Sequence, residues 1–134
     1  FLSAECPVSR DYEDRLAALW RALEPRGVRW LAVAPNANES NEQLARMAAS
    51  APLPFPLLRD PGLRAVQTLG ITKTPAALVL DAGGAVRYRG AIDDARYPPR
   101  VQRQYVKEAV EALLAGRPVA HPEGWGLGCA IKRR

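Results

Sequence analysis

The sequence has two cysteines, Cys6 and Cys129, which lie close to its opposite ends. Cys6 is followed directly by Pro7, and Ser9 stands three residues after the cysteine. Pro7 is typical of the first position of a helix, because the N–H that proline lacks would be unpaired there in any case. Unpaired N–H groups and the helix dipole favour an anion at such a position. We therefore expect Cys6 to have a pKa below the usual value of about 8.5 and to be a reactive thiol.

The alternative is that Cys6 is a buried cysteine that serves as a small apolar residue. The apolar residues 1–4 indicate the end of a strand whose beginning is cut off, so Cys6 would lie at the carboxyl end of that strand. Reactive groups of open α/β sheets gather at this edge. Glu5 opposes thiolate formation, because a neighbouring carboxylate disfavours a second negative charge. On balance the position favours the reactive thiol.

Metal chemistry is not indicated by the other candidate ligands. Two cysteines are too few for a structural zinc site or a disulfide framework. The only histidine, His121, lies in the Pro/Gly-containing stretch VAHPEG, which is typical of a surface loop. The short ligand spacings of metal sites are absent from the sequence. We expect no metal and no cofactor.

Composition places the chain in the class of globular domains. It has 134 residues, of which 48% are hydrophobic, and this fits one domain with its own core. The net charge is +5, but Lys and Arg are scattered among acids and cluster only in the final IKRR, so we expect no nucleic-acid partner. No apolar run reaches the roughly 18 residues of a membrane span. The chain begins at Phe1 without a Met or a charged leader, which suggests an excised or processed domain.

Apolar periodicity and turn residues predict alternating strands and helices. Ser40 and Gln43 have the spacing of a capping box, and Asp60 followed by Pro61 indicates a second helix start. The expected elements are a strand end at 1–4, helix 7–23 ending at Gly27, strand 28–36, a helix over 44–51, an extended segment and helix within 55–69, two strands within 74–92 joined at 81–84, and helix 100–115.

This order predicts an α/β protein with a central mixed β-sheet and helices on both faces. Strand–helix alternation implies a parallel portion, and the hairpin within 74–92 adds antiparallel strands. The remaining residues, VAHPEGWGLGCAIKRR, have no periodicity and form a C-terminal extension.

The stretches SAECPVS and KTPAALVLDAGGAVRYRG, together with the element order, resemble the thioredoxin-like superfamily. Within it the chain is similar to the redoxin branch near the alkyl hydroperoxide reductase and thiol-specific antioxidant (AhpC/TSA) proteins. The resemblance implies a thioredoxin-like redoxin domain over 1–119, lacking the start of its first strand, and an extension over 120–134 that carries Cys129.

The resemblance also assigns roles to individual residues. Ser3, Cys6 and Pro7 fit the peroxiredoxin pattern Thr/Ser-x-x-Cys-Pro. Pro75 is the candidate cis-proline, and Thr74 before it would offer its backbone to an extended substrate. The alternative for Pro75 is an ordinary proline at the start of a strand.

The sequence departs from both family patterns. Ser9 occupies the place of the second cysteine of the thioredoxin Cys-x-x-Cys motif, and Glu5 replaces the usual tryptophan. The peroxiredoxin arginine that polarises peroxide is not found at Thr74 or Pro75, although Arg10 could approach Cys6 from the first helical turn. The departures leave disulfide exchange, peroxide reduction or neither as open alternatives.

The tail GWGLGCAIKRR carries apolar Trp125, Leu127 and Ile131, so we expect it to dock on the body of the protein. Its glycines permit tight turns and close backbone approach. Some bacterial redoxin-like proteins end in a similar GC-x-I pattern. If the tail docks near the first helix, Cys129 can form an intramolecular disulfide with Cys6 and resolve it in place of Ser9. The alternative is a free cysteine on a packed tail.

The position of Cys6 and the resemblance together imply a thiol oxidoreductase, either a thiol–disulfide oxidoreductase or a peroxiredoxin-like peroxidase, and the resemblance further implies an antioxidant role in cell redox homeostasis. Its partners would be a protein disulfide or a peroxide, and an external thiol reductant. The alternative is a non-catalytic thioredoxin-fold binding module or part of a larger multidomain protein. The oligomeric state stays open, and so does the compartment, between bacterial cytoplasm and periplasm.

Overall fold

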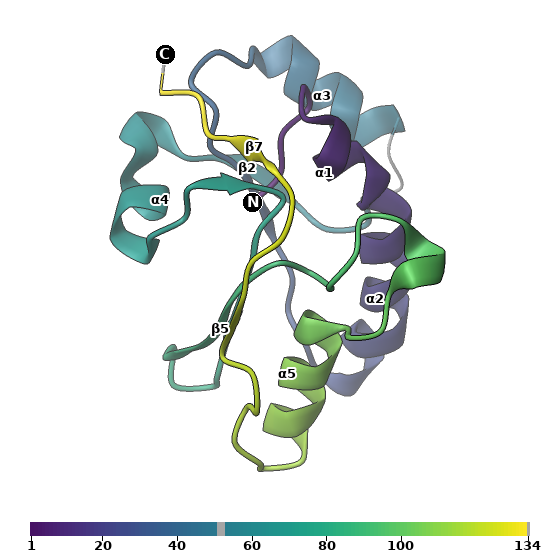
Figure 1. Cartoon of the computed structure of the whole chain (residues 1–134). Helices are drawn as coiled ribbons and strands as arrows, with labels where there is room; N and C mark the ends of the chain where they lie inside the picture. The colour runs from purple at the N-terminus through teal and green to yellow at the C-terminus, as the bar shows by residue number, and fades with distance from the viewer. Residues whose placement is uncertain (51–52, 134) are drawn as a thin grey trace. The chain divides into compact units, whose positions relative to one another are not determined.

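The computed structural model describes residues 1–50 and 53–133, and the chain divides into two compact units (Figure 1). The first unit contains Phe1–Pro75 together with the tail from Gly128 onward. The second unit contains Ala76–Leu127. The segment after the last helix therefore contributes to both units. The predicted boundary between 119 and 120 stays a prediction.

The first unit begins with two helices, where the sequence predicted one. Helix α1 spans Pro7–Asp11 and helix α2 spans Glu13–Leu23. The break falls at Tyr12, whose N–H donates to the Ser9 carbonyl three residues back, as in a 3-10 turn. Tyr12 is buried, and the Arg15 guanidinium lies over its ring at 3.7 Å. The 3-10 turn η1, Glu24–Arg26, follows α2 and ends at Gly27, which has a left-handed φ of 89°.

Two short parallel strands follow. Strand β1, Ala32–Ala34, pairs with β2, Leu57–Arg59, so β1 is shorter than the predicted strand 28–36. The prediction of a strand over residues 1–4 is wrong: the N–H of Leu2 donates to the Val33 carbonyl, but the segment forms no strand. It nevertheless lies against β1 and leads directly to Cys6.

Helix α3, Asn41–Ser50, begins with the predicted capping box. The Gln43 side chain accepts the Ser40 N–H at 2.7 Å, and the Ser40 hydroxyl accepts the Gln43 N–H at 3.1 Å. The predicted last residue of this helix, at position 51, lies outside the described residues.

Asp60 caps a helix, but later than predicted. The 3-10 turn η2, Pro61–Leu63, comes between Asp60 and helix α4, Arg64–Leu69. Leu63 adopts a left-handed φ of 60°, which interrupts the helical path. The Asp60 carboxylate reaches past this turn and accepts the N–H groups of Ala65 and Val66 at 2.9 and 3.1 Å.

Strand β3, Lys73–Thr74, completes the first unit by pairing antiparallel with β7, Cys129–Ala130. The tail strand β7 is drawn in yellow in Figure 1, beside the start of the chain. The predicted docking of the tail is therefore confirmed for this segment. It forms a ladder on β3, whereas the sequence indicated no regular structure there.

The second unit is built on the predicted hairpin. Strands β4, Ala77–Leu80, and β5, Val86–Gly90, pair antiparallel, and β6, Glu123–Gly124, joins β5 in parallel. Helix α5, Tyr105–Leu114, packs on β4 and β5. It starts later than predicted: residue 100 ends the 3-10 turn η3, Pro98–Arg100, and residues 101–104 form no helix.

The architecture is the predicted mixed α/β type, with helices flanking short sheets. Within residues 1–50 and 53–133, the hydrogen-bonded strands form three small sheets, with orders β1-β2, β3-β7 and β4-β5-β6. Over the part of the chain that the structure describes, no helix combines the length and apolar character that crossing a membrane requires.

Asp60→Ala is expected to lower the free energy of unfolding by about 1 kcal/mol, because two N–H groups at the start of α4 lose their acceptor. Guanidinium titration of the oxidised protein measures the difference. Asp60→Asn is the matched control, since it keeps one of the two acceptor oxygens and should recover only part of the loss. Equal stability of Asp60→Ala and the wild type would contradict the role of the cap.

Candidate functional site

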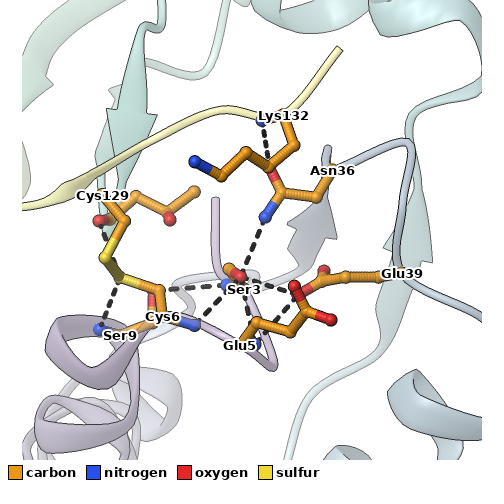
Figure 2. Close-up of a disulfide and its surroundings, with 9 residues drawn as sticks. Ser3, Glu5, Cys6, Ser9, Asn36, Glu39, Cys129 and Lys132 are labelled. Carbon is orange, nitrogen blue, oxygen red and sulfur yellow. Dashed lines mark hydrogen bonds between the residues drawn. A yellow bond between two sulfur atoms is a disulfide. The ribbon is translucent and has the colours of Figure 1, made fainter. Parts of the chain in front are cut away.

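Cys6 and Cys129 form a disulfide between residues 123 positions apart (Figure 2). Their Cα atoms are 5.9 Å apart, within the roughly 7 Å that a disulfide requires. The predicted pairing of the two cysteines is thus confirmed, and neither is a free thiol in this state. Cys6 is only 2% exposed.

Cys6 is the N-cap residue of α1, and Pro7 takes the first helical position as predicted. The Ser9 N–H points at the Cys6 Sγ, 3.5 Å away. The carbonyl oxygen of Thr74 lies 3.3 Å from the same sulfur. In the disulfide this sulfur has no proton, so the second contact becomes a hydrogen bond only when the disulfide is reduced to the thiol.

The Thr74–Pro75 peptide bond is cis, as predicted from the resemblance. Thr74 is fully buried and pairs directly with Cys129 in the β3–β7 ladder. Its hydroxyl has no hydrogen-bond partner among the described residues. The residue before the cis-proline therefore contacts both halves of the disulfide, one through its carbonyl oxygen and the other as a strand neighbour.

The hydroxyl of Ser3 is the centre of a buried hydrogen-bond network beside Cys6. It donates to the Glu39 carboxylate at 2.6 Å. It accepts N–H groups from the Cys6 and Glu5 backbones, both at 3.2 Å, and from the Asn36 side chain at 2.9 Å. A hydroxyl has a single proton to donate, and here that proton is directed to Glu39.

Glu39 is 2% exposed and was not identified from the sequence. Its Oε2 accepts the Ser3 hydroxyl and the Glu5 N–H, while its Oε1 has no partner among the described residues. In the stretch PNANESNEQ nothing distinguishes it from an exposed acid such as Glu42. Its burial depends on Ser3, which lies 36 residues away.

Asn36 connects this network to the tail and was also missed. Its Nδ2 donates to Ser3, and its Oδ1 accepts the backbone N–H of Lys132 at 2.7 Å. The Ala37 N–H donates to the Lys132 carbonyl at 2.9 Å. The one available signal was the position of Asn36 after β1, at the carboxyl end of a parallel strand, where functional groups of α/β sheets gather.

Ser9, Glu5 and Arg10 have different relations to Cys6. Ser9 is buried, and its hydroxyl accepts the Ser3 N–H at 3.2 Å. The Glu5 carboxylate accepts hydrogen bonds from Gln43 and Asn38, and Figure 2 shows its side chain extending toward Glu39. Arg10 is exposed, whereas Cys6 is buried. The expected effects of Glu5 and Arg10 on the thiol stay predictions.

No group of three or more potential metal ligands of the His, Cys, Asp and Glu types occurs in the ranges that the structure describes. His121 lies in the second unit, where its ring meets the edge of Tyr105.

A cysteine at the start of the first helix, facing the residue before a cis-proline, characterises the thioredoxin-like redoxin fold. The AhpC/TSA family model matches residues 1–89, which is most of the chain. The chain belongs to the AhpC/TSA family, and its fold is thioredoxin-like, as the sequence predicted.

Two solved structures are similar over 98% of this chain. One is an uncharacterized conserved protein from Geobacillus kaustophilus, with a TM-score of 0.87, 28% identity and 74% of that chain covered. The other is a hypothetical protein from Sinorhizobium meliloti 1021, with a TM-score of 0.84, 25% identity and 76% covered. No curated protein matches the chain.

Gly128→Ala is expected to weaken the pairing of the tail with β3. A Cβ at this position would lie 2.6 Å from the Thr74 carbonyl oxygen and 3.2 Å from the Lys73 side chain, so the two strands would have to separate. We expect a loss of about 1–3 kcal/mol in the unfolding free energy of the oxidised protein, the usual cost of overpacking. Denaturant titration without reductant measures it.

Gly126→Ala is the matched control, because its Cβ would meet only the Ala91 methyl group at 3.4 Å, an ordinary contact. A Gly128→Ala protein as stable as Gly126→Ala would show that the tail does not need the close approach to Thr74.

Proposed function

We propose that the protein is a thiol–disulfide oxidoreductase in which Cys6 is the nucleophile and Cys129 is the resolving cysteine. The observation that carries this proposal is the Cys6–Cys129 disulfide, which joins the cysteine at the first helix to the only other cysteine. Membership of the AhpC/TSA family supports redox chemistry at Cys6.

The reaction begins with both cysteines reduced. The Cys6 thiolate attacks one sulfur of a substrate disulfide, forms a mixed disulfide and releases the other substrate sulfur as a thiolate. The Cys129 thiolate then attacks the Cys6 sulfur, forms the internal disulfide and displaces the second substrate sulfur. The substrate has gained two electrons. Two thiols of an external reductant return these electrons to the protein and leave as a disulfide.

The surroundings of Cys6 support its role as the nucleophile. The Ser9 N–H is directed at its sulfur and can donate to a thiolate there. The hydroxyl of Ser9 is bound to the Ser3 backbone, and a hydroxyl cannot close a disulfide, so the resolving role falls to Cys129. Pro7 fixes the start of the helix that presents both groups.

A disulfide substrate is favoured over a peroxide by the Ser3 hydroxyl. Peroxide reduction at a Thr/Ser-x-x-Cys motif calls for a hydroxyl and a cation at the sulfur. Here the Ser3 proton is directed to Glu39, and Arg10 is exposed while Cys6 is buried. An antioxidant role and a part in cell redox homeostasis stay predictions that depend on the substrate.

The β3 strand supports a polypeptide as the disulfide substrate. Thr74 already pairs with an extended cysteine-containing segment, the tail strand β7. A substrate segment with the same backbone geometry can add to β3 when β7 has left, with its cysteine placed next to Cys6. Thr74 and Pro75 would then be substrate-binding residues.

A non-catalytic binding module is the second candidate, and the burial of Cys6 favours it. The disulfide closes almost the whole chain into a loop, and chain-entropy estimates give such a bond up to about 4.7 kcal/mol of stabilisation. A purely structural disulfide would therefore also account for the geometry. The two functions differ in whether reduced Cys6 exchanges with other disulfides.

Cys6→Ser is expected to abolish insulin disulfide reduction in the presence of a thiol reductant, because the attacking sulfur is lost. Cys129→Ser should instead accumulate a mixed disulfide between Cys6 and insulin, since the resolving attack is missing. Turnover is followed by insulin precipitation, and the mixed disulfide by non-reducing mass measurement. Hydrogen peroxide consumption, measured in parallel, separates peroxidase activity from exchange.

Retained turnover in Cys6→Ser would overturn the proposal. Two results together would also overturn it: iodoacetamide labelling in which the Cys6 of the reduced protein titrates like an ordinary thiol, and a Cys129→Ser variant that forms no mixed disulfide. That combination would instead support the binding module.

A further inference from the structure

The tail is attached to the first unit at two separate places. At the first, β7 pairs with β3, and the N–H of Ile131 donates to the Thr72 carbonyl at 3.2 Å. At the second, both backbone polar groups of Lys132 bind the loop after β1, through the Asn36 side chain and the Ala37 N–H. Figure 2 shows Lys132 above Asn36, with the disulfide to one side.

The two attachments have different fates in the proposed reaction. A substrate segment that pairs with Thr74 takes the place of Cys129 in the ladder, so β7 must leave β3 for it to enter. Lys132 does not bind β3 and can stay on the Asn36 loop. Because Lys132 is three residues after Cys129, a fully extended chain lets Cys129 move no more than about 11 Å from this anchor.

We propose that Asn36 is a positioning residue for the resolving step, which holds Lys132 so that Cys129 stays within reach of Cys6 while the disulfide is open. This inference rests on the proposed function, in which Cys129 resolves Cys6. The tether keeps the Cys129 thiol at a high effective concentration near the Cys6 sulfur. Cys129 can therefore compete with external thiols for that sulfur although the tether itself makes no contact with it.

The side chain of Asn36 suits this role. It is 4% exposed, and its Nδ2 is committed to Ser3, which fixes the orientation of the amide. The Oδ1 is then directed at the Lys132 N–H. Aspartate has an acceptor for Lys132 but no donor for Ser3, whose own proton goes to Glu39. An amide supplies the donor and the acceptor together.

The test measures the equilibrium of the protein with glutathione. Two glutathione thiols reduce the Cys6–Cys129 disulfide to two thiols and become glutathione disulfide. The ratio of oxidised to reduced protein at equilibrium gives the equilibrium constant for forming the disulfide, which we call the closure constant. Asn36→Ala, which loses its hydrogen bonds to both Lys132 and Ser3, should lower the closure constant about three- to tenfold, because the released tail holds Cys129 at a lower effective concentration near Cys6. Lys132→Pro, which removes the N–H and leaves the buried network intact, should lower it similarly.

Lys132→Ala is the matched control, because it removes the side chain and keeps the backbone N–H, so its closure constant should equal that of the wild type. The double variant Asn36→Ala/Lys132→Pro should fall no further than either single variant, since both remove the same contact. Fully additive losses would overturn the proposal. An unchanged constant in Lys132→Pro would overturn it even if Asn36→Ala does not fold.

A second measurement separates tail positioning from an effect on Cys6 itself. In a Cys129→Ser background, Lys132→Pro should leave the iodoacetamide rate of Cys6 unchanged, because it keeps the Asn36–Ser3 hydrogen bond beside Cys6. A rate that changes by the same factor as the closure constant would mean that the Lys132 contact acts on Cys6 itself and would overturn the proposal. The closure constant does not depend on insulin turnover, so a failed turnover assay rejects the proposed function without deciding the role of Asn36.

Discussion

The hydroxyl of Ser3 has one proton and two lone pairs, and four groups compete for them. The proton goes to Glu39, while N–H groups from Cys6, Glu5 and Asn36 share the lone pairs. One buried oxygen thereby orients the segment before the first helix and the loop after β1. An oxygen surrounded in this way is not free to bind a small substrate, so its contribution to chemistry is to hold the Cys6 backbone.

The tail is held by contributions of different size. The disulfide closes nearly the whole chain into a loop, and the entropy that this removes from the unfolded state stabilises the folded protein by up to about 4.7 kcal/mol. Each net hydrogen bond contributes about 1 kcal/mol, and the β3–β7 ladder is two residues long. Once the disulfide is reduced, the covalent term disappears and only these weaker contacts remain.

The features predicted from the sequence are those with local causes. The capping box of Ser40 and Gln43, the proline after Cys6 and the hairpin turn that begins at Asp81 all depend on residues within a few positions of each other. The cis bond before Pro75 followed from family resemblance, since the sequence alone does not distinguish it from an ordinary strand-entry proline. The helix break at Tyr12 was missed, because an uninterrupted apolar spacing gives no sign of it.

Glu39 and Asn36 were missed for a different physical reason. Each is an ordinary polar residue in a loop, and its burial is possible only because distant groups satisfy it: Ser3 in both cases, and for Asn36 also the tail backbone at Lys132. The two cysteines were identifiable because they are the only thiols in the sequence and Cys6 directly precedes a proline that starts a helix. A carboxylate or an amide acquires its role from its partners. The shared partner Ser3 reaches them through the N-terminal segment that lies against β1, and the tail adds only the Lys132 contact, so the network around the site becomes visible only in the folded protein.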